Sequence, residues 1–350
     1  MRNRLLLLAP LALGCAGEKP APPAEAPAAP VEYAYVTNED SHDLTIIDTR
    51  TDSVVATVPV GRRPRGVRVS PDGKLVFVAL SGSPKCPPTM PDAECAKLPS
   101  DKTADGVAVL DAATHQVVKT LPAGSDPEAF DIGQGGATVV VSNEDAGQAS
   151  IVEVATGTVL ATVEVGEEPE GVTIHPDGGS AWITGETDHN ITVIDAKTGM
   201  RMTQIPVGKR PRGIAFLPNG SRAYVTNETG GTVSVIDVAS RTVIKTLPMG
   251  ESAKPMGVAV SVDGKRVYVS TGRGRKIIAL DPVTDSIVGS VEAGARPWGI
   301  ALTRDGTKLY AANGPSGDVS VVDTKTMAVV KTVKAGSSPW GVAVGLRTED

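Results

Sequence analysis

The chain has 350 residues, and its 34 Lys and Arg against 40 Asp and Glu give a formal net charge of −6. This acidic balance argues against a general nucleic-acid backbone binder, which needs surplus basic residues to displace counterions. With 41% hydrophobic residues the chain can bury a core, so wholesale disorder is excluded. Abundant Val, Thr, Gly and Pro favour strands and tight turns, so we expect an all-β protein.

The chain opens with a segment, 1–14, that has the composition of a signal peptide. A basic start precedes nine uncharged residues, 5–13, a run too short to span a bilayer, which takes about 20 residues. The sequence LALGC resembles the lipobox of bacterial lipoproteins, although Ala12 stands where that family prefers Leu. The resemblance implies cleavage before Cys15 and acylation of its thiol. The alternative is an ordinary secretory signal followed by a chance Cys.

The next segment, 15–32, is dominated by Ala, Pro, Glu and Lys and offers nothing to pack. Such a composition predicts a semi-extended tether. Together with Cys15, it predicts a protein of the periplasm or cell surface that is held on a bacterial membrane by its lipid anchor alone.

The chain has three cysteines, Cys15, Cys86 and Cys95. One lipid and one disulfide would leave no thiol over, as an oxidising compartment favours. The alternative is a metal pair, but the neighbouring Asp92 and Glu94 are hard oxygen donors, and no second Cys pair or His completes a zinc shell. We therefore predict a Cys86–Cys95 disulfide and no metal.

A repeat of about 42 residues dominates the rest of the chain. The repeated element is a short apolar strand that ends in an acidic residue, at spacings of 63, 42, 42, 42, 44 and 42 residues: Asp48, Asp111, Glu153, Asp195, Asp237, Asp281 and Asp323. The extra length of the first interval predicts an inserted loop within 81–104. A second repeated motif, in which an anchoring Pro follows Gly by three residues, occurs once in each unit and is longer by two residues at Gly250.

Each repeat contains four predicted strands, which are clearest in 211–248. Four antiparallel strands in a unit of this length predict a propeller blade, so seven units predict a seven-bladed β-propeller over 33–345 with a tail at 346–350. Residues 33–60 supply only three strands, whereas 339–344 form a lone first strand. We therefore expect the C-terminal strand to complete the first blade and to close the ring, because an open array would leave an exposed strand edge.

Several segments of the repeat resemble the YVTN-repeat family of bacterial and archaeal β-propellers. They are YVTNE at 35–39, GRRPRGVRVSPDGK at 61–74, YVTN at 224–227 and TVSVIDVASRTV at 232–243. The resemblance extends over 33–345 and implies a seven-bladed propeller. It implies little about function, because this scaffold serves adhesion, ligand binding and some catalysis.

The first strand of a blade begins, and the second ends, at the same rim of a propeller. The residue after each anchoring Pro is therefore expected at one mouth of the central channel, where the insertion and the acidic ends of the second strands also lie. An aromatic pair beside a guanidinium suits a planar or anionic ligand. The alternative is that Arg and Glu pair between blades and that each Trp plugs a blade junction. Six of the seven residues that follow these prolines are candidate ligand-binding residues: Arg65, Glu128, Glu170, Arg212, Trp298 and Trp340. The remaining one is Met256.

Motifs for catalysis are few. His42 and His189 are expected in loops near the mouth, and His115 and His175 at the far rim. For all four we favour solvated turn residues over a metal ligand or a catalytic base. The chain has no CxxCH haem motif and no G-x-S-x-G nucleophile motif, and no helix follows the Gly-rich segment 272–275. We therefore predict no catalytic residue and no cofactor.

Together these features predict a monomeric, lipid-anchored envelope propeller without catalytic activity, which binds a small ligand or an envelope protein through its mouth. The alternative is an enzyme that uses the same mouth. It would be either a lyase similar to the virginiamycin-inactivating propellers or a redox partner similar to the haem-d nitrite reductase propeller.

Overall fold

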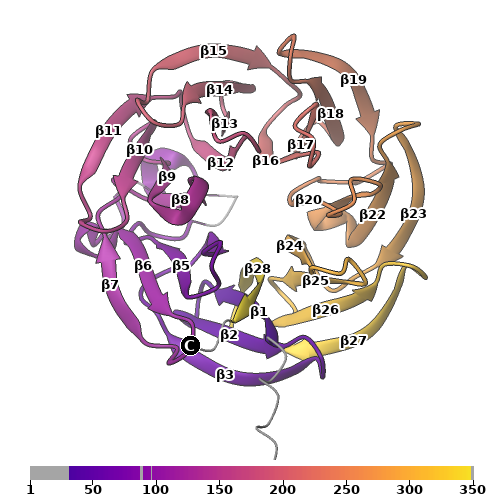
Figure 1. Ribbon diagram of the computed structural model, residues 1–350, viewed down its shortest axis with the longest axis horizontal. Helices are drawn as coiled ribbons and strands as arrows, with labels where there is room; N and C mark the ends of the chain where they lie inside the picture. The colour runs from indigo at the N-terminus through magenta and orange to yellow at the C-terminus, as the bar shows by residue number, and fades with distance from the viewer. Residues whose placement is uncertain (1–30, 87–89, 96, 348–350) are drawn as a thin grey trace, which may run out of the picture.

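The computed structural model describes residues 31–86, 90–95 and 97–347 as seven four-stranded antiparallel sheets arranged in a ring (Figure 1). The predicted signal peptide, the lipidation site at Cys15 and all but two residues of the tether lie outside the described residues, as do 348–350. Within the described ranges, no helix has the length and apolar character needed to cross a membrane. The predicted seven-bladed propeller is confirmed.

Each blade runs from an inner strand at the central channel to an outer strand at the perimeter. Blade 1 contains β28 (Pro339–Arg347), β1 (Val31–Asn38), β2 (Asp43–Asp48) and β3 (Ser53–Pro59). Blade 2 contains β4 (Val67–Val69), β5 (Leu75–Leu80), β6 (Gly106–Asp111) and β7 (Val117–Leu121). Blade 3 contains β8 (Pro127–Ile132), β9 (Thr138–Asn143), β10 (Gln148–Glu153) and β11 (Val159–Glu164).

The other four blades follow the same order. Blade 4 contains β12 (Pro169–Ile174), β13 (Ser180–Gly185), β14 (Asn190–Asp195) and β15 (Arg201–Pro206). Blade 5 contains β16 (Pro211–Phe216), β17 (Arg222–Asn227), β18 (Thr232–Asp237) and β19 (Thr242–Pro248). Blade 6 contains β20 (Val258–Val260), β21 (Val267–Ser270), β22 (Lys276–Asp281) and β23 (Ser286–Glu292). Blade 7 contains β24 (Pro297–Leu302), β25 (Lys308–Asn313), β26 (Asp318–Asp323) and β27 (Ala328–Lys334).

The hydrophobic core lies between neighbouring blades rather than in one central mass. One cluster joins Val36 and Ile47 of blade 1 to Tyr310 and Val319 of blade 7. Because a middle strand is covered on both faces, it is buried almost without interruption, whereas the outer β3 alternates between exposed and half-buried residues. This is why the middle strands are continuous apolar runs in the sequence and the outer strands are not.

Blade 1 closes the ring as predicted, because β28 pairs antiparallel with β1. At the mouth Asn38 is aligned with Pro339, and at the opposite rim Val31 is aligned with Arg347. The two strands therefore extend two residues beyond the expected limits of 33 and 345 at either end. Residues 31 and 32 belong to the propeller rather than to the tether, and 346 and 347 belong to it rather than to the tail.

Inner strands β4 and β20 are shorter than the sequence predicts, beginning three residues after their anchoring prolines. The chain nevertheless already runs beside its neighbour there, since the Arg65 N–H donates to the Ala79 carbonyl at 2.9 Å and the Met256 N–H donates to the Ser270 carbonyl at 2.9 Å. The residue after the proline consequently keeps the same place in all seven blades.

The predicted insertion lies between β5 and β6. Its described part contains α1 (Asp92–Cys95) and η1 (Lys102–Ala104). Cys86 and Cys95 form the predicted disulfide, with their Cα atoms 5.8 Å apart.

Candidate functional site

The mouth is built from a backbone corner that recurs around the ring. In most blades the residue before the anchoring proline has a positive φ, a backbone conformation that residues other than glycine rarely adopt. The proline then fixes φ of the first inner-strand residue and turns the chain into the channel. The residues with a positive φ are Arg63 (41°), Asp126 (55°), Glu168 (49°), Arg210 (55°), Arg296 (53°) and Ser338 (54°).

The residue after the proline is held by the preceding blade. In that blade a Thr or Ser of the second strand donates its hydroxyl to the carbonyl of the mouth residue, as Thr37 does to Arg65 at 2.6 Å. Thr37 and Thr226 are the third letters of the two YVTN segments, which gives that letter a physical role. The same hydrogen bond joins Ser142 to Glu170 (2.6 Å), Thr184 to Arg212 (2.9 Å), Thr226 to Met256 (2.5 Å) and Ser270 to Trp298 (2.6 Å).

A close approach between inner strands requires glycine two residues after most of the prolines. A Cβ added at Gly257 would lie 2.6 Å from the Trp298 carbonyl oxygen, and one at Gly341 would lie 2.5 Å from that of Arg65. Neighbouring inner strands are therefore packed backbone against backbone at the mouth.

Arg65 lies at the centre of one group of buried charges. It is 7% exposed, and its Nη1 pairs with Glu128 and lies 3.2 Å from Glu144 Oε2 and 3.8 Å from Asp126 Oδ1. Its Nε lies 3.4 Å from Glu39 Oε1. Burial raises the pKa of Asp126 and of Glu144, although the charge of Arg65 acts in the opposite direction. Four carboxylates thus surround one guanidinium.

Arg212 lies at the centre of a second group. It is 9% exposed and pairs with Glu170 and Glu186, while its Nε lies 3.0 Å from Glu228 Oε2. Arg210 also pairs with Glu186. Burial raises the pKa of Glu186 to about 9, against the charge of Arg212 and with a further contribution from Glu170. Carboxylates are again in excess over the guanidinium groups that they surround.

These two groups contain four of the six candidate residues. Arg65, Glu128, Glu170 and Arg212 all pair between blades, which is the arrangement of the packing interpretation. Binding of a ligand by these four residues stays a prediction. None of their charges lacks a partner within the ring, and this limits what they offer to an incoming ligand.

The two remaining candidates, Trp298 and Trp340, form a pair of half-buried rings on neighbouring blades. Their centroids are 5.5 Å apart and their planes are inclined by 31°. The guanidinium of Arg296 lies 4.5 Å from the centroid of the Trp298 ring, and that of Arg212 lies 5.6 Å from it. The third tryptophan, Trp182, is only 1% exposed and packs on Phe216 in the core.

A cavity of about 130 Å³ opens along the channel beneath this pair. Four of the six candidates line it, namely Glu170, Arg212, Trp298 and Trp340, and so does Met256. Arg65 and Glu128 are not among its lining residues. The cavity is lined by inner-strand residues of all seven blades, and the two tryptophans are the largest side chains that line it.

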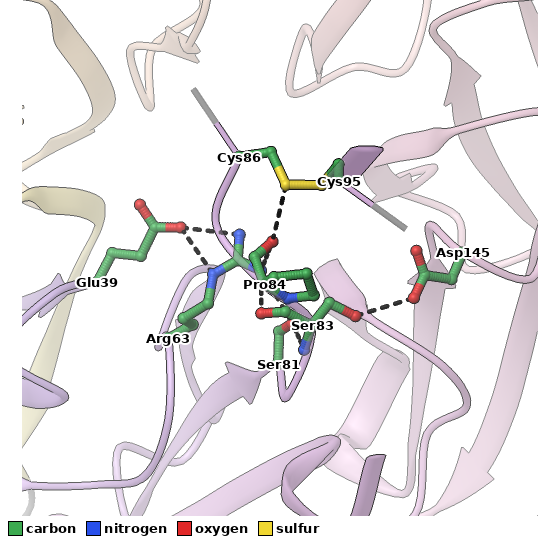
Figure 2. Close-up of a disulfide and its surroundings, with 8 residues drawn as sticks. All are labelled: Glu39, Arg63, Ser81, Ser83, Pro84, Cys86, Cys95 and Asp145. Carbon is green, nitrogen blue, oxygen red and sulfur yellow. Dashed lines mark hydrogen bonds and ion pairs between the residues drawn. A yellow bond between two sulfur atoms is a disulfide. The ribbon is translucent and has the colours of Figure 1, made fainter. Parts of the chain in front are cut away.

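The insertion contacts residues of the mouth near the Arg65 group (Figure 2). Arg63 donates through Nη1 to the carbonyls of Ser83, at 2.7 Å, and Pro84, while its other nitrogens bond Glu39. Ser83 donates to Asp145 of blade 3 at 2.9 Å. Lys85 Nζ lies 2.8 Å from Glu39 Oε2 of blade 1. The start of the insertion, just before Cys86, thus connects blades 1, 2 and 3.

The four histidines lie in turns. His42 and His189 have φ values of 61° and 54°, in loops of blades 1 and 4. The His42 Nδ1 accepts the Arg63 N–H at 3.2 Å, and His175 Nε2 lies 3.0 Å from the Gly220 carbonyl. In the described ranges, no group of three or more His, Cys, Asp or Glu residues is arranged to hold a metal.

Sequence reasoning missed the residues before the prolines. Arg63, Asp126, Arg210 and Arg296 reach the mouth as closely as the candidates after the prolines do. The repeated Gly-x-x-Pro motif contains these residues at its third position. Its recurrence in every blade could have indicated a turn there that places the third residue at the mouth.

Comparison with known proteins agrees with this architecture. The family model described as "Lactonase, 7-bladed beta-propeller" matches residues 200–345. The chain is a seven-bladed β-propeller. No curated protein matches it in sequence.

Solved structures resemble the chain over most of its length. A functionally unknown protein from Desulfotomaculum acetoxidans is 17% identical, with 91% of this chain and 99% of that chain covered and a TM-score of 0.74. A putative 6-phosphogluconolactonase from Bacteroides uniformis is 18% identical, with 90% and 99% covered and a TM-score of 0.71. A second one, from Bacteroides fragilis, is 18% identical, with 92% and 99% covered and a TM-score of 0.71. Such identities show the fold alone, and the YVTN resemblance stays a prediction.

Proposed function

We propose that this protein is a non-catalytic binding module that takes up a small ligand at the Trp298–Trp340 side of its mouth. The observation that carries the proposal is the pair itself: two large aromatic rings are left half-exposed at the entrance of a cavity of about 130 Å³. Concave sites lined by aromatic side chains and a few polar groups are typical of small-ligand binding.

The contrast with Trp182 supports a binding role for the pair. Trp182 fills a junction between blades and is removed from solvent, as a plugging side chain should be. Trp298 and Trp340 retain contact with solvent, although a propeller mouth can be closed by smaller apolar residues, as Met256 shows at the same position of blade 6.

Replacing Trp298 and Trp340 together by Ala tests the proposal. We expect the fold to survive and the binding of a co-purifying or screened ligand to be lost, because the rings contribute contact area at the entrance rather than core packing. Thermal melts and ligand titrations measure both effects, and Trp182→Phe is the control, since it alters a tryptophan remote from the mouth.

A large loss of stability in the double variant, with no ligand found for the unchanged protein, would contradict the proposal. Core aromatic truncations cost about 3 to 5 kcal/mol each, so a structural plug is readily recognised.

The proposal includes a lipid anchor at Cys15 and a location in the periplasm or at the cell surface. It is supported by the lipobox-like segment LALGC and by the Ala- and Pro-rich composition of 15–32. Cys15→Ser should move the protein from the membrane fraction to the soluble fraction; an unlipidated N-terminus in the wild type would refute the anchor.

The second candidate function is lactone hydrolysis. The lactonase family model covers the segment that carries Arg212, Trp298 and Trp340, and two structural neighbours are named putative 6-phosphogluconolactonases. In such an enzyme water would attack the lactone carbonyl and lose a proton to the cavity-lining Glu170, and the ring C–O bond would break. Glu186, whose pKa burial raises to about 9, would give its proton to the leaving oxygen. Proton release from 6-phosphogluconolactone in a pH-stat, lost in Glu186→Gln, would favour this enzyme over the binding module.

A further inference from the structure

Two guanidinium groups of the mouth have no acidic partner. Arg296 precedes Pro297 of blade 7 and is half-buried, whereas Arg273 lies in η3 (Gly272–Gly274) at the mouth end of blade 6 and is exposed. Within the part of the chain that the structure describes, neither side chain makes an ion pair or a side-chain hydrogen bond. In this they differ from Arg63, Arg65 and Arg212.

The nearest carboxylate is already engaged. Glu228 Oε2 lies 3.0 Å from Arg212 Nε and 3.5 Å from Arg210 Nε. Burial lowers the pKa of Arg296, and the positive charges of Arg212 and Arg273 lower it further, against the attraction of Glu228. Arg296 is therefore half-buried near two further positive charges and has no direct acidic partner, and a bound anion would offset the repulsion.

The stacking of Arg296 leaves its donors free. A guanidinium above an aromatic ring is held through its flat face, while its N–H groups point outward in the plane. The centre of the Arg296 guanidinium lies over the Trp298 ring, 4.5 Å from its centroid, within the range of such a contact. The N–H groups along the edge of a guanidinium plane match the two oxygens of a carboxylate or a phosphate.

We propose that Arg296 and Arg273 form an anion subsite of the mouth, which binds the carboxylate or phosphate of a small ligand whose ring packs against Trp340. This inference rests on the proposed function and specifies the class of ligand. The acidic groups around Arg65 and Arg212 then disfavour a second negative charge at the far end of the same ligand, so the ligand carries its anion at one end.

The local charge can be measured with tryptophan fluorescence, because two of the three tryptophans lie at this place and the third is buried. At constant ionic strength we expect iodide to quench the exposed emission more strongly than caesium. Because iodide is the stronger quencher even of free tryptophan, the test is the ratio of iodide to caesium quenching, which the combination of Arg296→Ser with Arg273→Ala should lower. Ser is chosen because Ser338 occupies the same corner of blade 1 with a φ of 54°.

Lys265→Ala is the control, since it removes one positive charge from an exposed turn at the opposite rim. An unchanged ratio of iodide to caesium quenching in the Arg variant would overturn the anion subsite. Acrylamide, which is neutral, reports whether the rings are accessible at all. Absence of acrylamide quenching overturns the proposed function, whereas acrylamide quenching with that ratio unchanged overturns only the anion subsite.

A matched ligand series then tests the chemical class by titration calorimetry. Benzoate, phenyl phosphate, benzyl alcohol and benzylamine share one ring and differ in charge. We expect one of the two anions to bind at least about tenfold more tightly than benzyl alcohol, and the Arg variant to lose that factor. The tighter anion identifies carboxylate or phosphate as the natural group. Equal or tighter binding of benzylamine, or absence of binding by both anions at millimolar concentration, would overturn the subsite.

Discussion

Two arcs of the same mouth use one backbone for different purposes. In the covered arc, which comprises the loop after β1 and blades 2 and 3, Arg63 and Arg65 are buried among carboxylates and contact the insertion or its partners. In the open arc, which comprises blades 6 and 7 and the inner strand β28, Arg296 occupies the same pre-proline corner as Arg63, with φ values of 53° and 41°, yet lies over a tryptophan and has no carboxylate partner. The presence of an acidic partner in the neighbouring blade decides whether the corner becomes an internal support or an open site.

Closure of the ring is the condition for both arcs, and removing it should have the largest effect. Deleting Ser337 onward removes β28, which carries Trp340 and completes blade 1. We expect aggregation or a much lower melting temperature, since blades stabilise one another and two strand edges become exposed. Light scattering during a thermal melt measures this; a truncated protein that melts like the full chain would contradict the closure.

An arginine that is buried among carboxylates and one without an acidic partner should respond differently to substitution. Arg212→Met leaves Glu170, Glu186 and Glu228 buried without their common partner, so we expect a loss of about 3 to 5 kcal/mol in the free energy of unfolding. Arg296→Ser breaks no ion pair and should cost less than about 1 kcal/mol.

Urea unfolding of the two variants side by side makes this measurement. Equal losses would remove the distinction between buried support and open site, and with it the reason for assigning the two arcs different roles.

The disulfide should affect the covered arc alone. Replacing Cys86 and Cys95 by Ser releases a loop closed over 9 residues of sequence, which costs about 2 to 3 kcal/mol in the chain-entropy view. The insertion contacts Glu39, Arg63 and Asp145 rather than Trp298 of blade 7 or Trp340 of β28, so acrylamide quenching of the two rings should not change. Increased quenching would show that the insertion also shields the open arc.

The smallest effect concerns the proton held by Glu186. Its folded pKa is raised from 4.5 to about 9, so the native state binds this proton more tightly and loses stability as pH rises from 4.5 to about 9. Glu186→Gln keeps a neutral group that donates to Glu170. Between about pH 6.5 and about pH 7.5 the wild type should lose up to about 1.4 kcal/mol relative to the variant. A difference that is constant with pH would mean that Glu186 is ionised throughout.

Much of the fold could be predicted because its determinants are periodic and local. The acidic strand ends recur every 42 to 44 residues apart from one insertion, and the middle strands are apolar without interruption. Blade number, closure by the last strand, the position of the insertion and the Cys86–Cys95 bridge all followed from such features. The mouth positions after the prolines followed as well, since they depend only on strand direction.

The pairing within the mouth could not be predicted in the same way. Arg65 meets Glu144 across 79 residues of sequence, and its choice among four carboxylates depends on side-chain distances that no local pattern encodes. Arg296 was missed for another reason. Its place above Trp298 depends on a positive φ before a proline. In proteins generally the residue before a proline is extended, so there was no reason in the sequence to expect this conformation.

The hydroxyl hydrogen bonds between neighbouring blades have a consequence for protein engineering. The Trp298 carbonyl is held by Ser270 of blade 6, and the Arg65 carbonyl is held by Thr37 of blade 1. A cassette cut at blade boundaries would separate each recognition side chain from the group that orients its backbone. The transferable unit is therefore offset from the blade: it begins with the second strand of one sheet and ends with the inner strand of the next.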